Sequence, residues 1–528
     1  MRKSANCKGG FMTVREQFDD FMRFCKRNKV SIGIVVLMTF LTYGFMLFNF
    51  SFSIDTEDIV VRQLDFYDGW IGINRYGLVF TKWLFGVLNI VPGYASILMV
   101  LSTIGYGIIW MYFFYWIGGP NQDNLKCNWI FSVLFLSSVP VLELVNFQCL
   151  SFEVAFAMLL CAVALIFEWR WIIKGGGKCE LFLAIIMGVW CFASYQAFVP
   201  LYISASLIAF LIQYQNNREE IEKKVISISL KLFVIFVIDY ILYKVLGRLM
   251  MYVWDIGAGT YTENMIQWGK MPVRSICIIL KDYFLDVFFA RNIFWNWGYL
   301  FVCLGLLLIG LRKIRDKIKK QRFYLYYLLV LCVFLFSPFL LPVLMGAAPV
   351  VRGQLALPFV VAIGTQIIFE KISGRLSNNM IIQMAVVGLL LLFTIRTNIM
   401  KDNRLLYSEY VVRQQEYALT EKIIGNIEET GADGNCAVVI LGQWSPQYNP
   451  SMIQGETLGR SFYEWDAEVP GGIEKRVLGY WRTLGYQYKT PGDEVRTKTI
   501  EERADMPAWP AEGSVVRDGN LVIIKLPN

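Results

Sequence analysis

The chain has 528 residues, of which 56% are hydrophobic and 16% aromatic, and its formal net charge is +8. This apolar share excludes a soluble globular domain and is typical of a protein that crosses a membrane many times. The sequence contains no histidine, which excludes Ser-His-Asp hydrolysis and His-ligated zinc, so any general base must be Asp, Glu, Lys, Tyr or Cys. No nucleic-acid-binding motif is visible, so no nucleic-acid partner is predicted, and membrane topology explains the positive charge.

The N-terminal 30 residues are polar and basic, and the first apolar run extends from about residue 31 to residue 50. The cations that precede it are Arg15, Arg23, Lys26, Arg27 and Lys29. By the positive-inside rule, residues 1–30 are predicted to lie in the cytoplasm, so the chain emerges on the outer face after residue 50. The run is too long and begins too late for a cleaved signal peptide, and we expect a retained anchor.

The first outer loop, residues 51–93, begins with the acidic cluster Asp55-Thr56-Glu57-Asp58. Residues 76–90 of this loop are apolar, but they contain Lys82 and are followed by a Pro-Gly pair. This pattern predicts a helix that lies along or enters the outer membrane surface rather than a full span.

Apolar runs of roughly 17–25 residues predict about eleven spanning helices. The expected spans are residues 31–50, 94–117, 128–145, 152–173, 181–195, 198–214, 225–246, 293–311, 324–344, 352–369 and 380–399. The fifth and sixth are the least distinct because each is short. No internal repeat is visible, which weakens the prediction of a transporter built from inverted repeats.

Lys and Arg gather in the loops that this count assigns to the cytoplasm. They are Lys126, Arg170, Lys174, Lys178, Arg218, Lys223, Lys224, Lys371, Arg375 and the basic residues of 312–322. The outer turns near Asn146, Gln196 and Ala347 are almost free of them. This asymmetry and the odd number of spans predict that the C-terminal part lies outside.

Two longer segments complete the predicted architecture. Residues 247–292 are expected to form a second outer loop, rich in polar and aromatic residues. Residues 400–528 turn polar, with a predicted helix near 409–429 and strand-like runs at 437–441 and 521–524. We therefore expect an all-α polytopic membrane protein, with a membrane domain of residues 31–399 and a small extracytoplasmic α/β domain.

The acidic pair Asp55 and Glu57 is the first candidate for chemistry. Two residues apart, the side chains face the same way in an extended loop and diverge in a helix, where one would act as base and the other would orient it. The alternative is a solvated loop with ordinary acidic residues. The cluster could also bind Mg²⁺ or Mn²⁺, but no further ligand motif is present, so no metal site and no required cofactor are predicted.

Two arginines are candidates for binding a phosphate. Arg75 lies on the same outer loop as the acidic pair, and Arg352 is the lone cation of an otherwise uncharged outer turn. An arginine can hold a phosphate through two parallel hydrogen bonds, which lysine cannot match. The alternative for both is contact with lipid headgroups.

Polar and aromatic residues at the outer ends of the spans are candidates for binding sugar or acceptor. They are Glu143, Glu153, Tyr195, Gln196 and Trp254. Carboxylates near the membrane are costly and therefore suggest function, although access to water near a helix end weakens that argument. The alternatives are a helix-capping turn for the Tyr-Gln pair and an interfacial aromatic belt for the tryptophan.

The first-loop pattern Ile54-Asp55-Thr56-Glu57, followed by Trp70 and Asn74-Arg75-Tyr76, resembles the bacterial type II glucosyltransferase family of serotype conversion. That family typically shows an acidic pair, then Trp, then Gly-Arg-aromatic. The turn Ser194-Tyr195-Gln196-Ala197 is similar to its Tyr-Gln element. The resemblance covers roughly residues 31–399 and departs at Asn74, where Gly is expected, which concerns backbone geometry rather than charge.

The resemblance implies a GT-C-type fold and a polyprenyl-phosphate-linked sugar donor used on the outer face, without a nucleotide-sugar site. By the same resemblance, Asp55 and Glu57 form the acidic pair and Arg75 is the cation on the phosphate side.

Together these observations predict an integral-membrane glycosyltransferase, a glucosyltransferase by the resemblance, in the bacterial cytoplasmic membrane. Its expected partners are the donor lipid, a surface glycan acceptor and membrane lipids. Asp55 would act as general base, Glu57 would orient the sugar or tune Asp55, and the two arginines would stabilise the departing phosphate. One alternative is a flippase or transporter for a lipid-linked glycan, which predicts functional charges near the bilayer midplane. Another is a non-catalytic scaffold that displays the C-terminal domain.

Overall fold

The computed structural model describes residues 14–50, 52–61, 63–118, 129–216, 218–315, 321–373 and 380–527. Residues 1–13 of the expected cytoplasmic segment lie outside these ranges. So do Lys126, Arg375 and residues 316–320 of the expected basic loop, all of which entered the topology prediction.

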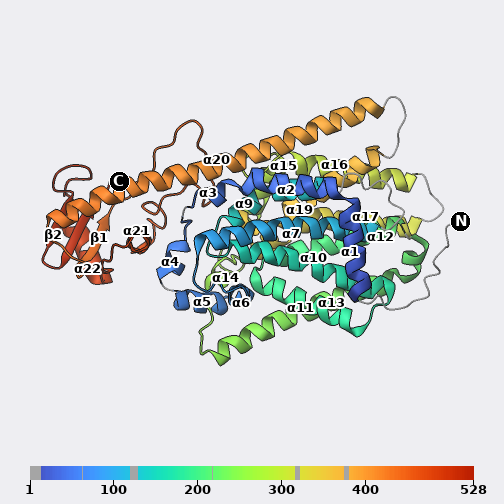
Figure 1. Ribbon diagram of the computed structural model, residues 1–528, viewed down its shortest axis with the longest axis horizontal. Helices are drawn as coiled ribbons and strands as arrows, with labels where there is room; N and C mark the ends of the chain where they lie inside the picture. The colour runs from blue at the N-terminus through green and yellow to red at the C-terminus, as the bar shows by residue number, and fades with distance from the viewer. Residues whose placement is uncertain are drawn as a thin grey trace.

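The molecule consists of a large helical body and a small C-terminal part at one end of its long axis (Figure 1). Within the described residues, five helical stretches are long and apolar enough to cross a membrane. They are α7 (Pro92–Gly118), α10 (Ser151–Lys174), α12 (Phe198–Asn216), residues Ile221–Val253 of α13 (Arg218–Val253), and Leu325–Met345. The last stretch combines α17 (Gln321–Phe336), η3 (Ser337–Phe339) and α18 (Leu340–Met345). A multi-pass membrane protein is therefore confirmed.

The other expected spans also contain helix. These helices are α2 (Lys29–Tyr43), α3 (Phe45–Phe48), α8 (Trp129–Leu136), α9 (Val139–Val145), α11 (Lys178–Ser194), α16 (Gly298–Arg315), α19 (Ala356–Ser373) and the first part of α20 (Met380–Glu429). The helix α1 (Val14–Arg27) precedes them. The expected third span is broken between α8 and α9 before Pro140, whose ring cannot donate a backbone hydrogen bond. A total of eleven crossings stays a prediction.

The segment predicted as the first outer loop, residues 51–93, is mostly helical. It contains α4 (Thr56–Val61), α5 (Gln63–Gly72) and α6 (Tyr76–Leu84). Helix α6 lies where a helix on the membrane surface is predicted, and that position stays a prediction. It ends before Gly86, which adopts a φ of +67° that favours glycine.

Residues 247–292, expected as a second outer loop, contain helix, and their place outside the membrane stays a prediction. Helix α13 continues to Val253, and the segment contains α14 (Tyr261–Asn264) and the 16-residue α15 (Val273–Phe288). In α15 the buried residues Ile276, Tyr283 and Val287 recur at helical spacing, so burial of one apolar face stabilises a helix in a segment that reads as polar overall.

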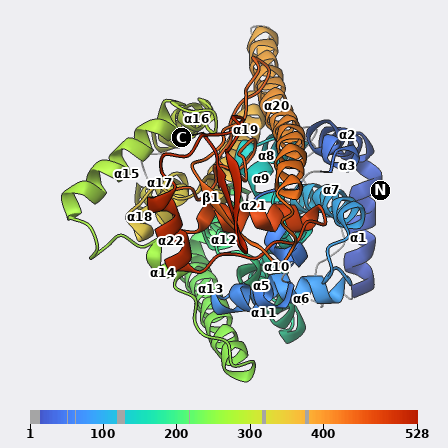
Figure 2. The same ribbon diagram turned by 90° about the vertical axis from the view of Figure 1, so that its left-hand side faces the viewer.

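The C-terminal part is a small α/β unit, as expected. Its three strands are β1 (Ala437–Leu441), β2 (Val515–Asp518) and β3 (Leu521–Lys525), in the order β1-β3-β2. Strand β1 pairs in parallel with β3, Ala437 opposite Leu521, and β2 pairs with β3 as an antiparallel hairpin. Helices α21 (Gly472–Thr483) and α22 (Asp493–Glu502) complete the unit, which lies over one end of the helical body (Figure 2).

Helix α20 joins the two parts of the molecule. It is a single helix of 50 residues that begins in the body and continues into the C-terminal part (Figure 1). At 1.5 Å per residue it is about 75 Å long. The expected domain boundary at residue 400 therefore falls inside a continuous helix rather than in a linker.

Candidate functional site

The two acids of the first outer loop converge on one arginine of the C-terminal part. Asp55 directly precedes α4 with a φ of +73°, and Glu57 lies in the first turn of that helix. Arg476 Nη1 donates to Asp55 Oδ1 at 2.7 Å and to Glu57 Oε1 at 2.7 Å. The side chain of Asp55 is 38% exposed, whereas that of Glu57 is fully buried. The two acids thus meet although only Glu57 is helical.

Arg476 is held by a second contact and by close packing of its helix. Its Nε donates to Asp466 Oδ2 at 2.7 Å, and its side chain is only 8% exposed. Gly479, three residues further along α21, allows a close approach, because a Cβ there would lie 3.0 Å from Glu57 Cγ. The face of α21 that carries both residues is therefore docked on the acidic pair.

The charges at this contact are not fully compensated. Burial raises the pKa of Glu57 from 4.5 to about 7, although the Arg476 guanidinium opposes the shift. Burial alone would lower the pKa of Arg476, but Asp55, Glu57 and Asp466 outweigh it and hold that pKa above its ordinary value. Glu57 Oε2 accepts no hydrogen bond from the described residues. One arginine is therefore shared among several acids.

Arg75 is positioned by the Tyr-Gln turn that the sequence analysis singled out. Its Nε donates to Gln196 Oε1 at 2.9 Å, and its guanidinium lies 4.6 Å from the centre of the Tyr195 ring. Gln196 in turn donates to the carbonyl oxygen of Ile73 at 2.7 Å. Asn74 adopts a φ of +62°, a conformation that glycine favours and that asparagine tolerates better than most residues. The departure from the expected Gly-Arg pattern thus keeps the backbone shape.

No carboxylate within the described part of the chain forms an ion pair with Arg75. Its guanidinium also lies 5.8 Å from the ring centre of Tyr261, a residue of α14. Arg352, Tyr195 and Asp55 also lie near Tyr261. An arginine held by neutral groups can accept an anion there.

Arg352 has an internal partner. Its Nη1 donates to Glu456 Oε2 at 2.8 Å, and its guanidinium lies 4.7 Å from the ring centre of Phe147. The backbone N–H of Val351 donates to the other oxygen of Glu456 at 2.8 Å. The anion that we expected for this cation is therefore present in the chain itself, and phosphate binding by Arg352 stays a prediction.

Two further predicted residues are occupied by contacts within the protein. Glu143 accepts hydrogen bonds from the backbone N–H groups of Glu456 and Thr457 at 2.8 and 3.1 Å. Glu153 forms a 2.7 Å ion pair with Lys82, and both side chains are 2% exposed. Trp254 follows the end of α13 and is 54% exposed. A sugar-binding role for these three residues stays a prediction.

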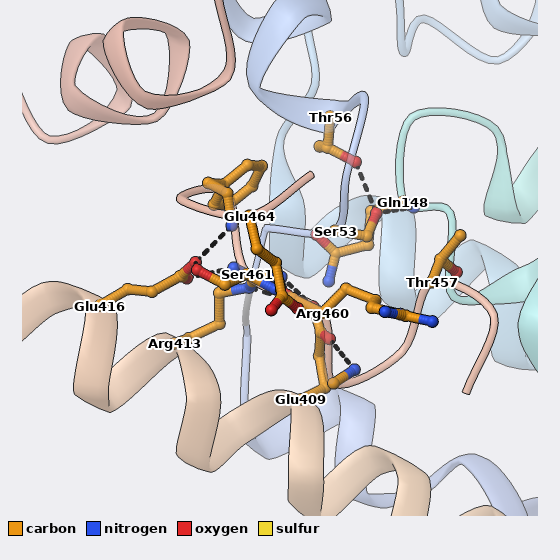
Figure 3. Close-up of polar contacts among 12 residues, drawn as sticks. Ser53, Thr56, Gln148, Glu409, Arg413, Glu416, Thr457, Arg460, Ser461 and Glu464 are labelled. Atoms are coloured by element: carbon orange, nitrogen blue, oxygen red, sulfur yellow. Dashed lines mark hydrogen bonds and ion pairs between the residues drawn. The ribbon is translucent and has the colours of Figure 1, made fainter. Parts of the chain in front are cut away.

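A second charged cluster anchors the connecting segment 453–465 to α20. Arg413 binds Glu409 and Glu416 on the same helix, and its Nη2 donates to the carbonyl oxygen of Arg460 at 2.7 Å (Figure 3). Glu409 Oε2 accepts from the Gly459 N–H at 2.6 Å. The segment bound here also carries Glu456, so α20 holds the loop that contacts both Arg352 and Glu143.

Sequence reasoning missed Arg476 and Glu456. Arg476 lies 421 positions from Asp55 and is one of 50 Lys and Arg residues, so no local pattern distinguishes it. Tyr261 was expected only as one of the aromatic residues of the segment 247–292 that suit sugar binding. No group of three or more Asp, Glu or Cys side chains in the described ranges is arranged to hold a metal ion, and binding of Mg²⁺ or Mn²⁺ by the acidic cluster stays a prediction.

The fold and the site define a multi-pass membrane protein with acids and arginines gathered beside residues 51–93. The family model described as Glucosyl transferase GtrII matches residues 44–369, more than half of the chain, and the chain belongs to this family. The protein is therefore a glycosyltransferase. Comparison with curated proteins and with solved structures gives no match.

Proposed function

We propose that this protein transfers glucose from a polyprenyl-phosphate donor to a cell-surface glycan on the outer face of the cytoplasmic membrane. The observation that carries the proposal is the position of Arg75, which Gln196 and Tyr195 hold beside Tyr261 without an acidic partner among the described residues. The partly exposed carboxylate of Asp55 also lies near Tyr261, so the proposed base and an arginine available to an anion are close together. Family membership supports the glucosyl group, and the long apolar helices support a lipid-borne donor.

In the proposed reaction the acceptor hydroxyl oxygen attacks the anomeric carbon of the donor, and its proton moves to the Asp55 carboxylate. The bond between that carbon and the phosphate oxygen breaks, and the electron pair remains on the phosphate. Arg75 stabilises this leaving group with two parallel hydrogen bonds. A positioned base accelerates such a step by about 10²–10⁴-fold, so phosphate stabilisation and positioning must supply the rest.

The remaining predicted residues take supporting roles in this proposal. Gln196 and Tyr195 orient Arg75, because one binds its Nε and the other lies against its guanidinium. Arg352 remains paired with Glu456 and adds positive charge near Tyr261. Glu57 orients Asp55 through their shared partner Arg476.

The test is a reconstitution assay. Purified full-length protein is added to membranes from cells that lack the gene, with radiolabelled polyprenyl-phospho-glucose as donor and the cells' own surface glycan as acceptor. Asp55→Asn keeps the side-chain size but cannot take the proton, so transfer should fall by about 10²–10⁴-fold. Asp68→Asn, a change at an exposed acid of α5, is the matched control and should retain wild-type transfer. Full transfer by the Asp55→Asn, Glu57→Gln double variant would refute the catalytic reading.

The outer location is tested separately by labelling in intact cells, in a variant whose native cysteines are replaced by serine because Cys179, Cys277 and Cys332 are free and exposed. A cysteine at Glu501, an exposed residue of α22, should react with a membrane-impermeant maleimide. A cysteine at Lys178, an exposed residue at the start of α11, should react only after the membrane is opened. The opposite pattern would place Asp55 in the cytoplasm.

One observation favours a lipid-linked glycan transporter instead. Asp239 lies fully buried on the membrane helix α13, and its two carboxylate oxygens accept no hydrogen bond from the described residues. The carboxyl group of Glu168 on α10 lies near that of Asp239. If Asp239→Asn abolishes export of a lipid-linked glycan while the Asp55→Asn variant retains it, transport rather than transfer is the function.

A further inference from the structure

The contact between Arg476 and the acidic pair lies outside what family membership covers. The family match ends at residue 369, whereas Arg476 belongs to the C-terminal part. Family membership therefore gives Arg476 no role, although it is the described cation that binds both predicted catalytic acids.

The geometry of this contact is more specific than a surface ion pair. Three hydrogen bonds of 2.7 Å leave one guanidinium for three carboxylates, those of Asp55, Glu57 and Asp466. The side chain is 8% exposed, so water screens these charges poorly. Such an arrangement needs the planar fork of arginine, because the single ammonium of lysine cannot reach three acids in the same way.

The surroundings of Glu57, the acid beside the proposed base, oppose its ionisation. Glu57 is buried, and Asp55 lies close enough to repel it. A cation in direct contact favours the charged form of Glu57. Nη1 is also a common anchor for the two side chains, so it fixes the distance between them.

We propose that Arg476 is a positioning residue of the glycosyltransferase, which aligns Asp55 with Glu57 and favours the charged form of Glu57, so that the C-terminal part completes the active site. This inference rests on the proposed function, in which Asp55 is the general base. It makes docking of α21 on α4 a requirement for transfer.

Other charged or titratable groups also face the acids. Asp58 of α4 binds Lys475 of α21 at 3.3 Å, and Asp466 lies on the loop before α21. Arg352, Tyr261 and Cys149 interact electrostatically with Asp55. Each of these groups remains in place when Arg476 alone is changed, so a change in pH dependence can be assigned to Arg476.

The test is the pH dependence of kcat/KM in the reconstitution assay. Arg476→Met removes the cation that opposes the raised pKa of Glu57, so Glu57 ionises only at higher pH. The acidic limb of the profile should move up by about 1–3 pH units. Activity should accordingly fall at least about tenfold at pH 6 and recover in large part at pH 9. Arg476→Lys, which keeps a charge but not the fork, should shift the limb by less.

Arg482→Met is the matched control, since it makes the same change on the same helix at a residue that binds the carbonyl oxygen of Tyr488. Its profile should match the wild type. A loss in Arg476→Met that is equal at every pH would leave only a structural role, and a gain in rate would mean that Arg476 blocks the site. Either result overturns the proposal.

If Arg476→Met does not fold, the decision falls to Arg476→Lys, whose folding is checked by thermal unfolding. A folded Arg476→Lys variant with a wild-type profile also overturns the proposal. The proposed function is refuted by a different result. Full transfer by Asp55→Asn would show that Asp55 is not the general base. An inactive Asp55→Asn variant together with an unaffected Arg476→Met variant would refute only the role of Arg476.

Discussion

Two arginines of this molecule each bind more than one acid, and the differences between the two clusters separate a structural contact from a site. Arg413 lies with Glu409 and Glu416 on one helix, and all three side chains are at least 94% buried. Arg476 instead joins acids from another part of the chain, and Asp55 is 38% exposed.

The acids of the two clusters also differ in how many of their oxygen atoms accept hydrogen bonds. Glu409 and Glu416 also accept hydrogen bonds from the backbone N–H groups of Gly459 and Phe462, at 2.6 and 2.5 Å. In contrast, Glu57 Oε2 has no partner among the described residues, and Asp55 adopts a φ of +73°. Complete hydrogen bonding stabilises one arrangement, whereas unsatisfied atoms and an unusual backbone conformation are typical of functional sites.

The largest expected effect is a loss of stability when the cluster of Arg413, Glu409 and Glu416 is changed. Arg413→Met leaves two buried acids without their cation, which should cost about 3–5 kcal/mol and release the C-terminal part from α20. Limited proteolysis and thermal unfolding of the purified protein measure this. Lys498→Met, at a residue of α22 that is 74% exposed, serves as the control and should change neither. Normal stability of Arg413→Met would contradict the contrast between the clusters.

The next effect concerns the arginine that is available to an anion. Arg75→Lys keeps the charge but loses one of two charge-assisted hydrogen bonds, each worth about 1.5–3 kcal/mol. Transfer should therefore fall by about 10–100-fold. The same change at Arg352, which is already paired with Glu456, should cost less. A larger loss in Arg352→Lys than in Arg75→Lys would reverse the roles of the two arginines.

The smallest effect concerns the pH dependence of stability. The pKa of Glu57 is raised from 4.5 to about 7 in the folded protein, mainly by burial. The folded state therefore binds this proton more tightly than the unfolded state, and the stabilisation is lost as the pH rises through that interval. Glu57→Gln cannot titrate, so its unfolding temperature should fall less between pH 5 and pH 8 than that of the wild type. Parallel curves for the two proteins would exclude the raised pKa.

Local patterns explain which parts of the fold could be predicted. Length and hydropathy indicate helix at every expected span, and short apolar runs indicate the strands predicted at 437–441 and 521–524. The continuity of α20 was missed because hydropathy changes sharply near residue 400. The absence of Pro throughout residues 380–429 was the available signal, since helix propensity does not depend on whether a face meets lipid or water.

Short motifs explain which parts of the site could be predicted. Asp55, Arg75 and Gln196 were found because each belongs to a brief pattern at the outer end of a helix. The contact of Arg75 with Gln196 confirms that the two patterns meet. Arg476 and Glu456 act through tertiary contacts with residues more than 100 positions away, and no periodicity marks such partners in one sequence.

The single 50-residue helix α20 also sets the orientation of the C-terminal part about the helix axis relative to the helical body. Inserting one residue between Ile399 and Glu409 would turn everything beyond it by about 100° about the helix axis and move it about 1.5 Å outward. Seven inserted residues would restore the direction to within about 20°, but they would displace the part by about 10 Å. No change in length preserves both quantities, so α20 determines the angle and the height at which α21 meets the first outer loop.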